Sequence, residues 1–280
     1  MMTLKEAAKY ADKTVFTDTY GTATFYGQLH PFTDNVRSSQ AARRRILETA
    51  PEVSMPARQT VTEGSSGVVY LVAYPAVDSY KGRSIRFKYP ACHTDGVFSV
   101  RTIAQVLANS GGVTDAYVAV SYVKQWDQPD SSFFFSNFEL TYARSLTVAV
   151  GDILIGAGKY FLAMQPGRVD DIGFGAVDVT EIVSPLATVT FKGYSGVIVP
   201  STDAYTETTI TNVPIFIEHT MLDYVHEALG FVKLEPGDKA ISFLKSKVTT
   251  VRPGDIIGTY RVIAVSDSGS TWKVHARRSS

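Results

Sequence analysis

Apolar and polar residues alternate along most of the chain in short runs that glycine, proline and small polar residues interrupt. Residues 58–90 are the clearest case: Ile85, Phe87 and Tyr89 alternate with polar residues, and glycine-containing turns separate the runs. This pattern predicts a three-stranded meander. The same kind of pattern predicts strands in three further regions, with three or four strands in the last: residues 14–26, 116–150 and 177–217.

Helical spacing is confined to short segments. We expect helices at residues 4–12, at residues 102–107, where Asn109 and the glycines after it end the pattern, and at residues 220–229, which Gly230 ends. The segment 34–50 fits a helix or a strand. Because the strands follow one another without long intervening helices, the predicted fold is mainly β, with antiparallel β-barrel or sandwich modules and a few short helices.

One hairpin pattern occurs twice. Gly151-Asp-Ile and Gly254-Asp-Ile each begin a short apolar strand, a glycine turns the chain again, and a strand with an early tyrosine returns. A fainter copy of the turn stands at Pro236-Gly-Asp. We divide the chain into a module at 1–100 with the N-terminal helix and a first barrel, a central module at 101–235, and C-terminal strands at 236–280 that pack with the central module.

The composition restricts the compartments and the classes of partner that we expect for the chain. Twenty-seven Lys and Arg balance 27 Asp and Glu, so no overall field attracts the chain to nucleic acid or an anionic membrane. The single cysteine, Cys92, excludes an intramolecular disulfide and favours a reducing compartment. The N-terminal residues lack the apolar core of a secretory signal, and no run approaches the ~18 apolar residues of a membrane span. We therefore expect neither general export nor insertion in a membrane.

The sequence has no nucleophile elbow, phosphate-binding loop or dinucleotide-binding glycine motif, and we expect no enzyme activity and no cofactor. The best metal candidate is the predicted helix after Glu218, whose possible ligands are His219, Asp223 and either His226 or Glu227. A solvent-exposed polar face is the favoured interpretation of that helix. Asp170 and Asp171 are expected in a loop, not as an acid–base pair.

Three other features carry candidate chemistry. Cys92-His93 is expected to be a packed cysteine, because neighbours in an extended chain do not face each other. The basic cluster Arg43, Arg44 and Arg45, with Arg58 beyond it, fits either phosphates or acidic partner groups, or solvated arginines. Phe133 and Phe135 belong to an aromatic run that fits either a contact with a neighbouring subunit or burial within one domain.

The segment 50–86 and the two Gly-Asp-Ile hairpins resemble the neck proteins of tailed bacteriophages, the head-closure, stopper and collar group. The shared elements are a glycine turn, a tyrosine-led strand, the Asp78-to-Gly82 turn and a further strand. The resemblance covers about half of the chain, which is about twice as long as a simple stopper. It implies a structural virion protein, made in the host bacterial cytoplasm and located in the neck.

The resemblance also implies partners. Copies would form a ring of six or twelve subunits between the portal or adaptor and the tail proteins, with packaged DNA as a further contact. Arg43, Arg44 and Arg45 would then serve salt bridges between subunits or the side that faces DNA. Two alternatives remain: a tail-associated module that binds glycans or the host, and a β-sandwich hydrolase that uses Asp170, Asp171 or Asp223.

Overall fold

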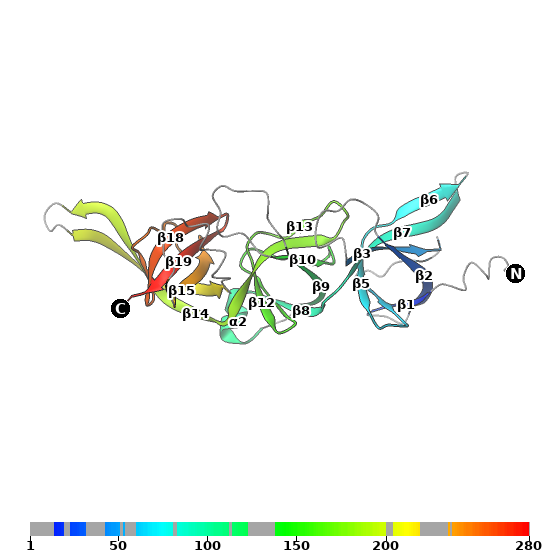
Figure 1. Ribbon diagram of the computed structural model, residues 1–280, viewed down its shortest axis with the longest axis horizontal. Coiled ribbons are helices and arrows are strands. Elements are labelled where there is room, and N and C mark those ends of the chain that lie inside the picture. The colour runs from blue at the N-terminus through cyan, green and yellow to red at the C-terminus, as the bar shows by residue number, and fades with distance from the viewer. Residues whose placement is uncertain are drawn as a thin grey trace.

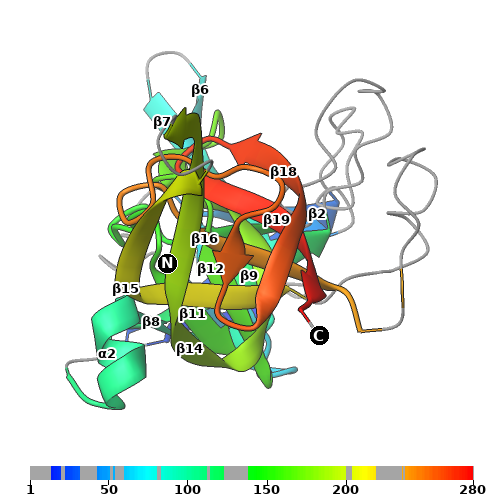
Figure 2. The same ribbon diagram turned by 90° about the vertical axis from the view of Figure 1, so that its left-hand side faces the viewer.

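The structure is a computed structural model, and it describes residues 14–19, 23–31, 43–50, 53, 60–80, 83–111, 114–122, 138–199, 204–218, 235 and 237–279. These residues form an elongated molecule in which three β-barrels stand in a row (Figure 1). Viewed from one end, the barrels lie behind one another along the long axis (Figure 2). Every strand pairing is antiparallel, which confirms the predicted fold class.

The first barrel closes on itself through six strands. Its strands are β1 (Thr14–Asp18), β2 (Thr24–Pro31), β3 (Arg44–Thr49), β4 (Thr60–Glu63), β5 (Val69–Val72) and β7 (Arg83–His93). They pair in the order β3-β2-β1-β4-β5-β7, and β7 returns to β3. The chain forms this ring because alternate residues such as Phe16, Leu47 and Tyr89 point inward and fill the core.

The second barrel follows after two residues and repeats this order. Its strands are β8 (Gly96–Arg101), β9 (Thr114–Tyr122), β10 (Phe138–Tyr142), β11 (Ile153–Gly156), β12 (Lys159–Ala163) and β14 (Gly175–Val199). The pairing runs β10-β9-β8-β11-β12-β14, and β14 returns to β10. Phe98, Leu140 and Phe161 lie in its core. A two-residue strand, β13 (Arg168–Val169), pairs with Gly175 and Ala176 of β14, on the edge of β14 opposite β10.

The third barrel uses β14 a second time. Its other strands are β15 (Ala204–Glu218), β16 (Lys239–Leu244), β17 (Ile256–Ile257), β18 (Tyr260–Ser268) and β19 (Thr271–Arg278). They pair in the order β16-β15-β14-β17-β18-β19, and β19 returns to β16. Counted from its own first strand, each barrel therefore has the same order, 3-2-1-4-5-6, closed between strands 6 and 3. One strand topology is used three times.

Local expectations are confirmed at several points. The predicted meander is present as β4-β5-β7, with the extra strand β6 (Ala76–Tyr80) paired to the outer half of β7. The predicted helix is α2 (Ile103–Ala108), where Thr102 caps the first turn and Asn109 ends it at a φ of 47°. The segment 34–50, left between helix and strand, contributes β3 over its described part.

The region 177–217 differs from expectation. It contains two long strands, the 25-residue β14 and the 15-residue β15, instead of three or four short ones. Register shifts, one of them around Pro185 between Val183 and Ala187, let the ladder continue where the sequence suggested a break. The predicted helices at 4–12 and 220–229 lie outside the described residues.

The Gly-Asp turn occurs three times with one geometry. Asp152, Asp255 and Asp238 each accept, through Oδ2, the backbone N–H of the residue three positions earlier, at 2.8, 2.7 and 2.9 Å. The glycine before each aspartate has a positive φ of 85°, 98° and 96°, as the third residue of a type II turn requires. The two predicted hairpins are present as β11–β12 and β17–β18, so the repeat marks the same place in the second and third barrels.

Candidate functional site

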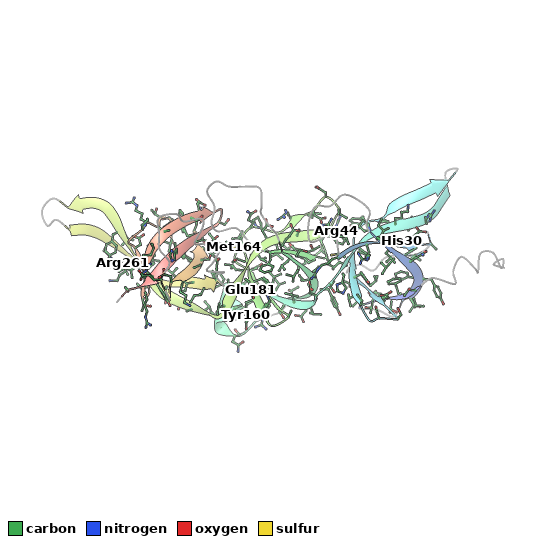
Figure 3. All side chains as sticks on the ribbon, in the orientation of Figure 1. His30, Arg44, Tyr160, Met164, Glu181 and Arg261 are labelled. Atoms are coloured by element: carbon green, nitrogen blue, oxygen red, sulfur yellow. The ribbon has the colours of Figure 1, made fainter. Side chains whose placement is uncertain are left out.

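The basic cluster of the sequence lies where the first barrel meets the second. Arg44 sits on β3 with its side chain on the outer face, in register with Cys92 of β7. Its Nη2 lies 3.2 Å from Oδ2 of Asp170, in the turn between β13 and β14. Figure 3 shows Arg44 between the two barrels. The Arg44 side chain is 9% exposed and that of Asp170 is 17% exposed, so the ion pair is largely shielded from water.

Both carboxylate oxygens of Asp170 have hydrogen-bond donors. Its second oxygen, Oδ1, accepts the backbone N–H groups of Ile172, Gly173 and Phe174 at 3.0, 2.8 and 2.8 Å. A carboxylate that accepts three backbone N–H groups and pairs with a guanidinium holds its loop in one conformation. The predicted loop at Asp170 and Asp171 is confirmed. The geometry gives Asp170 the role of a structural anchor.

Arg43 makes a second contact across this junction. It donates to Oδ2 of Asp95, in the short connection between β7 and β8. The same oxygen accepts the N–H of Val120 on β9 at 2.6 Å. Arg45 donates to the backbone oxygen of Arg44 at 2.8 Å. The structure therefore places Arg43 and Arg44 in contacts within one chain. Arg58, Phe133 and Phe135 lie outside the described residues.

Apolar packing supports these ion pairs. Leu71, Ala73 and Cys92, on the outside of the first barrel, form one buried cluster with Ala119 and Phe174 of the second barrel. Arg144 lies 4.0 Å from the ring centroid of Tyr74 at the edge of the same junction. A hydrophobic contact with ion pairs beside it restrains both the distance and the rotation between two barrels.

Cys92 and His93 do not form a catalytic pair. Burial raises the pKa of the Cys92 thiol to about 11, although Arg44 and Arg43 nearby act to lower it. The His93 ring instead packs edge-on against Tyr70, with 5.9 Å between centroids. The thiol is protonated at neutral pH and lacks the low pKa of a nucleophile. The expectation of a packed cysteine is confirmed.

The second junction is built differently, because β14 runs through both barrels. Met164 and Ile182 of the second barrel pack against Phe216, which points out of the third barrel, and Ile103 and Val106 of α2 cover this cluster. Figure 3 labels Tyr160 and Met164 in this region. A continuous strand cannot bend sharply without losing ladder hydrogen bonds. The second and third barrels are therefore joined through one shared sheet.

Sequence reasoning missed a buried polar cluster on the outer face of the third barrel. Lys273 Nζ lies 3.2 Å from Oε2 of Glu218, and Ser242 donates to the other oxygen of that carboxylate. Two residues further along β19, His275 Nε2 lies 2.9 Å from Oδ2 of Asp238. The signal in the sequence was the alternation of Lys273, His275 and Arg277 along one strand, which puts three basic groups on one face.

Arg277 completes this cluster. Its Nε and Nη2 donate to the two oxygens of Asp238 at 3.0 and 3.1 Å, and its Nη1 donates to Glu235 at 2.8 Å. Burial alone would raise the pKa of Asp238, but the hydrogen bonds from Arg277 and Glu235 N–H and the charge of His275 lower it below its ordinary value. Asp238 is thus matched by Arg277 and hydrogen-bonded through both oxygens, which is the condition under which a buried ionic group is tolerated.

Within the part of the chain that the structure describes, no three His, Cys, Asp or Glu side chains are grouped closely enough to hold a metal ion. The candidate ligands His219, Asp223, His226 and Glu227 lie outside that part, and Glu218 is bound to Lys273. No described helix has the length and apolar character needed to cross a bilayer. No family model matches the chain, and neither a curated protein nor a solved structure is similar enough to match it.

Proposed function

We propose that this chain is a structural virion protein of a tailed bacteriophage, a ring-forming collar or neck subunit that joins the portal vertex to the tail. The observation that carries the proposal is the array of three barrels of one topology, joined by a shared strand and by a buried ion pair. Such an array keeps a fixed length and orientation, which a subunit between two large assemblies needs.

The described polar groups support a structural role. Asp170, one of the three carboxylates named for the hydrolase alternative, has its oxygens bound by three N–H groups and Arg44. The buried charges of the third barrel bind one another. These groups strengthen junctions and faces of barrels. Because Arg43 and Arg44 already bind carboxylates of the second barrel, we do not assign packaged DNA to them.

The proposal is tested by capture on an immobilised portal ring. The wild-type chain should bind, and the ring it forms should contain six or twelve copies. A double variant, Arg44→Met with Asp170→Asn, loosens the first junction and should bind less well. Lys159→Met is the matched control, because Lys159 forms an exposed ion pair with Glu181 on the second barrel, away from the first junction and from both ends of the molecule. A wild-type chain that neither assembles nor binds portal contradicts the proposal.

A further inference from the structure

Two hairpins extend beyond the closed barrels, at opposite ends of the molecule (Figure 1). The first ribbon consists of β6 and residues 83–86 of β7, which lie beyond Phe87, the last residue of β7 that pairs with β3. The second ribbon consists of residues 193–199 of β14 and 204–208 of β15. It lies beyond Lys192, where the pairing of β14 with β17 stops.

Both ribbons have open edges among the described strands. β6 pairs with β7, and the outer parts of β14 and β15 pair with each other. A two-stranded ribbon in water is marginally stable, and each open edge carries a row of backbone donors and acceptors that another strand can bind. Apart from the two-residue β13, the other described strands are members of closed rings, so the two ribbons are the hairpins whose pairing is left incomplete.

The sequences of the two ribbons are complementary. Residues 76–86 contain three Lys or Arg and one Asp, whereas residues 193–208 contain two acidic residues and no Lys or Arg. The second ribbon also has the apolar run Val197-Ile-Val, which favours strand pairing. Two of these charges already have partners: Arg86 lies 2.6 Å from Glu48, and Glu207 lies 3.1 Å from Lys192. Such exposed pairs contribute little to stability, so they can exchange partners.

We propose that the first ribbon of one copy binds the second ribbon of the next copy by strand pairing, so that the chain assembles head to tail. This inference rests on the proposed ring and names the surfaces that build it. Because the two ribbons are different surfaces at opposite ends, the contact is heterologous, and it closes into a ring when the rotation between copies allows. The occupant of each ribbon is a second copy of this chain.

The test uses two full-length variants, each with one ribbon shortened. In the first, Asn-Gly replaces residues 79–85, so that Asp78 and Arg86 remain paired across a two-residue turn. In the second, Asn-Gly replaces residues 195–206, which keeps Tyr194 paired with Glu207 and keeps the 3.0 Å hydrogen bond from Tyr194 N–H to Asp255. Light scattering after size exclusion measures the mass of each variant alone and of their mixture.

The wild-type chain should form species larger than the 30.5 kDa monomer, and raising the salt concentration should weaken them. Each variant alone should be a monomer, because it lacks one half of the contact. The equimolar mixture should form a dimer of one copy of each variant and nothing larger. That dimer also shows that both variants are folded.

Three outcomes overturn the inference: a wild-type chain that stays monomeric, shortened variants that still assemble alone, or a mixture that forms no dimer. None of them decides the proposed function, because portal capture of the same variants is measured separately. Assembly that persists in both shortened variants, together with portal binding, would keep the neck role and place the contact elsewhere on the barrels.

Discussion

Arg44 of the first barrel and Asp170 of the second form an ion pair across 126 positions of sequence, with Nη2 3.2 Å from Oδ2. Removing one member leaves the other buried without its counter-charge. Arg44→Met should therefore lower the free energy of unfolding by about 2–4 kcal/mol. Chemical denaturation followed by circular dichroism measures the change.

Arg86→Met is the control for that variant. Arg86 is 45% exposed in its side chain and pairs with Glu48 on the surface, so its loss should cost less than about 1 kcal/mol. Equal effects of the two substitutions would show that the junction ion pair is not a special contact.

The thiol of Cys92 reports whether the first junction is closed. Its pKa of about 11 leaves on the order of a thousandth of the thiol ionised at pH 8, and the side chain is buried between the barrels. Alkylation by iodoacetamide should be slow in the native chain and faster in Arg44→Met. Labelling of the native chain at the rate of an unfolded peptide would contradict the packed junction.

Alanine substitutions at two turn glycines measure the cost of backbone strain and the cost of crowded packing separately. At Gly254 an added Cβ meets nothing within 4 Å, so Gly254→Ala should cost only the strain of a positive φ, about 1–2 kcal/mol. At Gly151 the same Cβ would lie 3.1 Å from Leu244 of the third barrel. Gly151→Ala should therefore cost roughly 1–3 kcal/mol more, as measured by thermal unfolding.

Acid should weaken the third barrel through Asp238. Its pKa is lower in the folded chain than in the unfolded one. The stabilisation is therefore fully present above the unfolded pKa of about 4 and is lost as the pH falls through the folded value. Asp238→Asn should be less stable at pH 7 and should show a flatter dependence of stability on pH below 4. An unchanged acid profile in that variant would assign the effect to other groups.

Local structure was predictable from the sequence where it depends on neighbours in the chain. The alternation around Phe87 and Tyr89, the end of α2 at Asn109 and the Gly-Asp turns each follow from residues a few positions apart. Barrel closure was not predictable, because the period of two sets the face of a residue but not its partner strand. The pairs Arg44–Asp170 and Lys273–Glu218 join distant segments, so no local pattern predicted which residues would pair.

The most direct test of the central claim is native mass spectrometry of the full chain, alone and mixed with an isolated portal ring. The account predicts a closed ring of six or twelve copies, formed in solution or on the portal. A chain that remains a monomer in both conditions, with no portal complex, would contradict it.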